Sequence, residues 1–125
     1  MSGPDANELL LTSRELLVGP LLAALPSHLH YECRMIASAM AIAVREIEQG
    51  ERCTQVEDRE LARLLAAHDL AGLTTRDGRA LLAQFIRQGL YDSQGSEQQA
   101  LLAALTDITR ARLAVSNPKV IANAR

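Results

Sequence analysis

Aromatic side chains are almost absent from this 125-residue chain: Tyr31, Phe85 and Tyr91 make up 2% of it, and there is no tryptophan. Modules that bind single-stranded nucleic acid stack bases on aromatic rings, and few rings are available here. Lysine is equally scarce, since Lys119 is the only one among 13 basic residues, and no run of basic side chains could follow a phosphate backbone. These shortages predict a protein that does not bind nucleic acid.

Cysteine is scarce too, and Cys33 and Cys53 stand in no metal-binding or redox spacing. A chain of this length buries enough apolar surface to fold without a disulfide or a metal. No basic segment followed by an apolar one marks a signal peptide. The longest nearly apolar run, residues 35–44, is too short to span a bilayer. We therefore expect a cytoplasmic protein with free thiols, no cofactor and no membrane-spanning segment.

Leucine and alanine dominate the apolar residues, which make up 48% of the chain. Both favour helices, and the clusters of β-branched residues typical of strands are absent. We predict an all-α fold, with residues 1–125 forming a single domain: one compact bundle of four to five helices. The spacing of apolar residues and the positions of glycine, proline and capping residues predict helices over residues 5–25, 27–49, from 54 onward, from 74 or 75 to 89, and 96–115. A flexible or partner-bound tail is expected over 118–125.

The second of these helices is predicted to be long and buried. Its apolar residues recur at spacings of three and four: Leu29, Cys33, Ile36, Met40, Val44 and Ile47. Met35, Ala39 and Ile42 extend the apolar surface around the other side of the helix. A helix that is apolar on nearly all sides is expected to be buried on nearly all sides. Ser27 is its expected N-cap, and Gly50 fits the left-handed position just beyond its end. Thr54 and Glu57 have the spacing of a capping box that begins the third helix, and Pro20 predicts a kink in the first.

Few residues could carry chemistry. His28 and His30 are two apart, so on a helix they point in different directions, and His68 falls on an apolar stripe. No histidine or carboxylate pair has the spacing of metal ligands, and no glycine-rich loop could hold phosphates. No nucleophile stands beside a base. We therefore predict no catalytic residue and no metal, in a protein that is not an enzyme.

Three arginines occupy positions that burial alone does not explain. Arg34 and Arg45 are eleven residues apart, almost an integral number of turns, so they share one face of the second helix. Arg112 lies on the apolar stripe of the last helix. A buried guanidinium needs a partner, which is an internal carboxylate, a backbone carbonyl or an anion on another molecule. The internal carboxylates considered as partners are Glu15, Glu46 and Glu48.

Two stretches, residues 30–50 and 112–118, resemble a known family. Its motif residues correspond to Arg34, Arg45, Glu46, Gly50, Asn117 and Pro118, and the resemblance covers residues 8–118. Where that family often has Phe and Leu, this chain has the similar Tyr31 and Ile47. It is a family of small bacterial proteins and domains of unassigned biochemical function. They are typically encoded beside, or fused to, kinases of the aminoglycoside-phosphotransferase type, with acyl-CoA dehydrogenases nearby.

The resemblance implies an accessory subunit. The kinase-like partner is expected to phosphorylate the hydroxyl of a 4-hydroxyacyl-CoA, and the small protein to bind and activate or stabilise that kinase. Its candidate contacts with a partner or an anion are Arg34, Arg45, Glu46, Arg112 and Asn117. Two alternatives stay open. One is an acyl-CoA or other anion-binding module that uses the arginines. The other is a self-associating protein, for example a homodimer, that pairs exposed leucine stripes.

Overall fold

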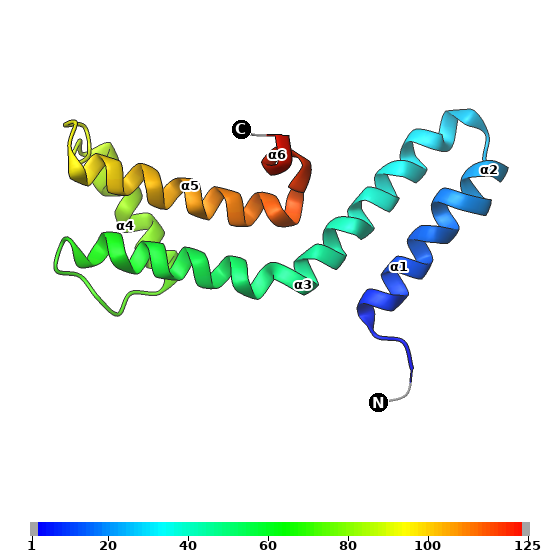
Figure 1. Cartoon of the computed structure of the whole chain (residues 1–125), viewed down its shortest axis with the longest axis horizontal. Helices are drawn as coiled ribbons and strands as arrows, with labels where there is room; N and C mark the ends of the chain where they lie inside the picture. The colour runs from blue at the N-terminus through cyan, green and yellow to red at the C-terminus, as the bar shows by residue number, and fades with distance from the viewer. Residues whose placement is uncertain (1–2, 124–125) are drawn as a thin grey trace. The chain divides into compact units, whose positions relative to one another are not determined.

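The computed structural model describes residues 3–123, and every regular element in that range is a helix (Figure 1). The predicted all-α class is confirmed. The chain packs as two compact units: unit 1 is Met1–Gly50 with Ala114–Arg125, and unit 2 is Glu51–Leu113. Two long helices, α3 (His30–Ala66) and α5 (Ser96–Ser116), contribute residues to both units. The expectation that residues 1–125 form a single domain stays a prediction.

In unit 1, helix α1 (Ala6–Leu16) begins at a complete capping box. The Asp5 carboxylate accepts a hydrogen bond from the Glu8 N–H at 2.9 Å, and the Glu8 carboxylate accepts one from the Asp5 N–H at 3.3 Å. Two backbone donors that the first turn would leave without partners are thereby satisfied. The predicted start of the first helix at residue 5 is confirmed.

The predicted interruption at Pro20 is confirmed, and it takes the form of a π-helical turn, Leu17–Leu21. Proline has no N–H to donate to the preceding turn, and a π-bulge accommodates this loss without ending the helix. The chain continues as α2 (Leu22–Ala24), and Pro26 then ends the segment by forcing the residue before it into an extended conformation. A 3₁₀ turn, Ser27–Leu29, leads directly into α3, with Pro26 in the capping position. The prediction that Ser27 is the N-cap is therefore wrong, because Ser27 already lies inside the helical turn.

Helix α3 is continuous over 37 residues, where the sequence predicted two helices separated at Gly50. Gly50 is not among the glycines with a positive φ, so the predicted left-handed cap is wrong. Thr54 and Glu57 lie within α3 and begin no helix. The physical reason is that one glycine in a helix interior costs only about 1 kcal/mol relative to alanine. The helix formers on both sides outweigh that cost.

The core of unit 1 lies between α1 and the first part of α3. Cys33, Ala37 and Val44 of α3 are buried. The Cys33 thiol donates to the carbonyl of Leu17 at 3.2 Å, and Arg14 Nε donates to the carbonyl of Ala37 at 3.2 Å. Both cysteines of the chain are free thiols, as expected. The α1 segment thus covers one face of α3.

The predicted burial of this helix nearly all round is wrong. Met35, Ile36 and Ile47 are exposed to 54%, 50% and 53%. A single neighbouring helix can cover only one side of a cylinder, and the apolar residues on the other sides of α3 stay open to solvent within the described chain. These exposed residues are considered below as a candidate interface.

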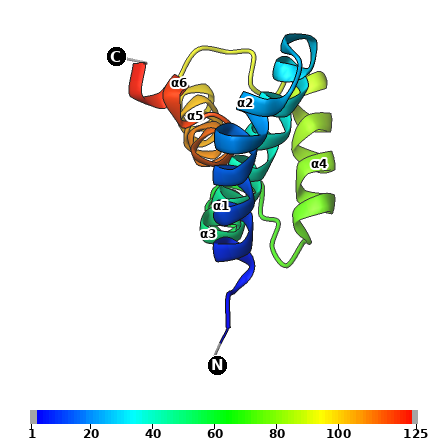
Figure 2. The same cartoon turned by 90° about the vertical axis from the view of Figure 1, so that its right-hand side faces the viewer.

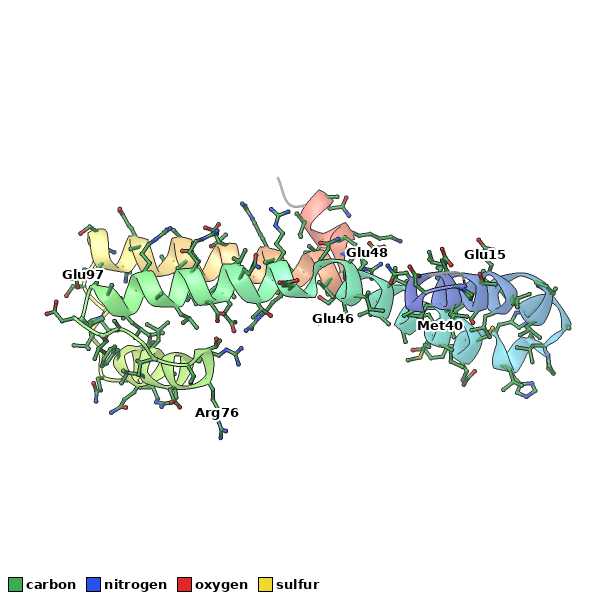
Figure 3. The ribbon with its side chains drawn as sticks, turned by 90° about the horizontal axis from the view of Figure 1, so that it is seen from below. Glu15, Met40, Glu46, Glu48, Arg76 and Glu97 are labelled. Atoms are coloured by element: carbon green, nitrogen blue, oxygen red, sulfur yellow. The ribbon has the colours of Figure 1, made fainter. Side chains whose placement is uncertain are left out.

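Unit 2 packs α4 (Thr75–Arg87) and α5 against different sides of α3 (Figures 2 and 3). Thr74 caps α4 by accepting from the Asp77 N–H at 3.1 Å, and Gly89 follows the helix with a φ of +84°, so the predicted ends of this helix are confirmed. The core of the unit is one apolar cluster from all three helices and Tyr91, with Phe85 packed against it. Its members are Leu61, Leu64, Leu82, Tyr91, Leu101 and Ala104.

The end of the described chain contains a second, short helix. Helix α5 ends at Ser116, as the Asn117-Pro118 pair predicts, but a short helix α6 (Pro118–Asn123) follows it. Proline is favourable at the first position of a helix because its fixed φ suits the turn and no N–H is required there. The expectation of a flexible or partner-bound tail over residues 118–125 stays a prediction, and residues 124–125 lie outside the described part.

Candidate functional site

Arg45 of α3 has an internal partner, and it is a backbone carbonyl. Its Nε donates to the carbonyl of Val115 at 2.6 Å, and the arginine is half-buried. Val115 lies one residue before the end of α5, where carbonyls lack partners within their own helix. A cation is also favourable at that end of the helix dipole. Arg45 therefore joins α3 to the end of α5 inside unit 1, one of the arrangements that the sequence left open.

The other predicted contact residues of unit 1 are exposed. Arg34 takes part in none of the ion pairs found among residues 3–123. Asn117 joins α5 to α6, and its carbonyl accepts from the Val120 N–H at 3.2 Å. Glu46 lies against Gly50, where a Cβ would stand 2.7 Å from Glu46 Oε1 (Figure 3). Glycine at this position thus leaves room for the Glu46 side chain along the helix.

Arg112 lies in unit 2 and is paired with a carboxylate that the sequence did not suggest. Its Nη2 donates to Oε2 of Glu57 on α3. Arg79 of α4 donates from Nε to Oε1 of the same carboxylate at 2.8 Å, and a second time from Nη2. Glu57 is only 6% exposed, whereas both arginine side chains are more than half exposed. Arg112 therefore pairs with an internal carboxylate, and Glu57 is not one of the three considered as partners from the sequence.

Glu57 connects the three helices of unit 2 through this arrangement. A buried carboxylate is costly unless charged donors surround it, and two guanidiniums from two helices meet that need. The sequence pointed to Glu57, but as part of a helix cap, because Thr54 and Glu57 have the spacing of a capping box. Glu57 could cap a new helix only if the preceding helix ended at Gly50. Helix α3 continues through Gly50, so Glu57 is free for another role.

An exposed apolar row on α3 is the most distinctive surface of unit 1. We call Ile36, Met40 and Ile47 of α3, together with Leu29 at the end of the preceding 3₁₀ turn, the α3 stripe. Their spacings of seven, four and seven residues place them along one face of a helix. Leu29, Ile36 and Ile47 are exposed, and Met40, labelled in Figure 3, is half-buried. Large apolar side chains gathered along one helical face mark a surface suited to another protein.

Metal and membrane features were also sought among residues 3–123. No group of three or more histidine, cysteine, aspartate or glutamate side chains is placed to hold a metal ion in that range. No helix in the same range has both the length and the apolar character needed to cross a bilayer.

The family of the chain follows from its sequence. Residues 23–120 match the domain of unknown function DUF6285. The chain belongs to the DUF6285 family. The match includes all of α3 and α5, and with them the α3 stripe, Glu57 and Arg112. No curated protein and no solved structure matches the chain.

Proposed function

We propose that this DUF6285 protein is a non-catalytic accessory subunit that binds a larger enzyme through the α3 stripe. The observation that carries the proposal is the row of exposed apolar residues formed by Ile36 and Ile47 of α3 and by Leu29 in the turn before it. Exposed apolar residues that recur at seven-residue spacing along a helix are suited to packing against another helix or into a groove. Methionine, as at Met40, adapts well to a partner surface.

The arginines support this binding role less directly than the sequence suggested. Arg45 donates to a backbone carbonyl and Arg112 to the buried Glu57, so each holds its own unit together. Arg34 is exposed on the same helix as the stripe and is the arginine best placed for a partner's carboxylate or phosphate. This distribution favours a protein partner over a module that binds acyl-CoA through all three arginines.

The proposed partner is an aminoglycoside-phosphotransferase-like kinase that acts on a hydroxyacyl-CoA, with this chain activating or stabilising it. The support for this choice is the resemblance of residues 30–50 and 112–118 described above. Both stretches fall within the DUF6285 match over residues 23–120. The identity of the partner can therefore be tested separately from the surface that binds it.

Co-expression with the kinase encoded nearest in the genome tests the proposal. The wild-type chain should co-purify with the kinase, and phosphorylation of the acyl-CoA should require both chains. Ile36→Glu puts a charge into the middle of the stripe and should weaken binding about 100-fold, the effect of burying an unpaired carboxylate at roughly 2–3 kcal/mol.

Leu102→Glu is the matched control, because Leu102 is an equally exposed leucine (57%) on α5 in unit 2. It should bind as the wild type does. Full kinase activity without this chain would exclude the accessory role. Equal binding by the Ile36→Glu and Leu102→Glu variants would exclude the α3 stripe as the surface.

A further inference from the structure

Unit 2 contains a cavity of about 410 Å³ between the last turns of α3 and the first half of α5. This volume lies within the range of about 300–1,000 Å³ that small-molecule sites occupy. Four alanines line it: Ala67, Ala100, Ala103 and Ala104. Side chains this short leave open the space that leucines would fill between two packed helices. The cavity plays no part in the function proposed above and is argued separately from it.

The cavity runs along two antiparallel helices. At one end of this pair, His68 in the turn after α3 is hydrogen-bonded at 2.9 Å to the hydroxyl of Tyr91, which precedes α5. At the other end, Glu57 of α3 binds Arg112 near the end of α5. The two helices therefore pass each other in opposite directions, and the cavity between them is an elongated groove.

Carboxylates line both ends of this groove. Glu97, labelled in Figure 3 at the start of α5, shares one end with Tyr91 and His68. Asp107 lines the other end together with Glu60, which is 3% exposed. Ten residues of α5 separate Glu97 from Asp107, which corresponds to about 15 Å at a rise of about 1.5 Å per residue.

The charge of the lining favours a cation. Three carboxylates line the cavity, and one of them, Glu60, already pairs with Arg59 at 3.5 Å and with Arg63 at 3.4 Å. Glu97 and Asp107 take part in none of the ion pairs found among residues 3–123. An anionic ligand would meet like charge at both ends, whereas a ligand with positive ends and an apolar middle would match the carboxylates and the alanines between them.

We propose that this groove binds a linear alkyl diamine, with one ammonium group at Glu97, the other at Asp107, and the methylene chain along the alanines. Each ammonium gains a carboxylate, and the methylenes leave water for an apolar wall. The Tyr91 hydroxyl and the His68 ring add polar partners at the first end. Burial raises the pKa of Tyr91 and the Glu97 charge raises it further, which agrees with a carboxylate close to the phenol.

Calorimetric titration of the full chain with 1,8-diaminooctane at low ionic strength tests this inference. We expect saturable binding at one site per chain, and weaker binding of octylamine, which has one charge. The dianion suberate, of similar length, should not bind. The variant Glu97→Gln with Asp107→Asn should bind 1,8-diaminooctane about tenfold more weakly, because two exposed ion pairs at roughly 0.7 kcal/mol each are lost. Ala103→Leu, which fills the groove without changing charge, should also weaken binding.

The control variant is Glu51→Gln, which removes an exposed carboxylate of α3 that does not line the cavity. It should bind 1,8-diaminooctane as the wild type does. Equal weakening by the control and the double variant would mean diffuse attraction to an acidic surface, and would overturn the proposal. No saturable binding, or equal binding of suberate, would overturn it as well. Circular dichroism of each variant verifies that the helices are retained.

Discussion

Removing both arginines that hold Glu57 should destabilise the protein by more than the sum of the two single effects. The Glu57 carboxylate is buried, with Arg79 on one oxygen and Arg112 on the other. After Arg79→Met or Arg112→Met alone, one guanidinium still neutralises the carboxylate. After both substitutions no guanidinium is left, and the carboxylate must be buried without a charged partner or be exposed by local unfolding.

The magnitudes follow from burial. Each single substitution loses a charge-assisted hydrogen bond whose donor is more than half exposed, so we expect a loss of about 1 kcal/mol in the free energy of unfolding. The double variant leaves a buried, unpaired carboxylate, for which about 3–5 kcal/mol is typical. The coupling energy should therefore be about 1–3 kcal/mol, a large part of the total stability of a domain this size.

Urea unfolding followed by far-ultraviolet circular dichroism measures this cycle. Adding Glu57→Met to the double variant should restore most of the stability, because an apolar residue in place of a buried charge needs no partner. Arg76→Met is the control: Arg76 is an exposed arginine of the same α4 helix, and its loss should change stability by less than about 0.5 kcal/mol. Additive single effects, or no recovery with Glu57→Met, would refute the reasoning.

Three further predictions concern single positions. Gly50→Ala should raise the free energy of unfolding by less than the usual gain of about 1 kcal/mol, because the new Cβ meets Glu46; combining it with Glu46→Ala should recover the full gain in the same urea assay. Burial first, and then a neighbouring carboxylate, raises the pKa of Tyr91 above its ordinary 10.0, so the unfolded phenol ionises before the folded one. The free energy of unfolding should therefore fall as pH rises above about 10 and level off above the folded pKa, and Tyr91→Phe should remove this component in urea titrations across that range. Arg45→Met should lower the unfolding free energy by about 1–2 kcal/mol, because the half-buried donor leaves a helix-end carbonyl without its partner, whereas Arg34→Met should leave it nearly unchanged.

Local sequence rules predicted the helices whose ends are fixed by local contacts. Thr74 and Gly89 bound α4, and the pair Asn117-Pro118 ends α5, because capping and backbone geometry depend on residues close in sequence. The same rules failed at Gly50, where a possible stop signal competed with helix-forming neighbours on both sides. Helix continuity there is a sum over many residues, and one glycine does not decide it.

The candidate sites depended on contacts between distant parts of the chain, which spacing does not reveal. The pairing of Glu57 with Arg112 joins residues 55 positions apart. The exposure of Ile36 could not be predicted either, because its apolar neighbours along α3 have the same periodicity as a buried face. Only the position of α1 decides which apolar face of α3 is covered.

The most direct test of the proposed function is a binding titration between the purified chain and the proposed partner, an aminoglycoside-phosphotransferase-like kinase. The wild-type chain and Leu102→Glu should bind with the same Kd, and Ile36→Glu should bind about 100-fold more weakly. A kinase that binds all three chains equally, or binds none of them, would contradict an accessory subunit that docks through the α3 stripe.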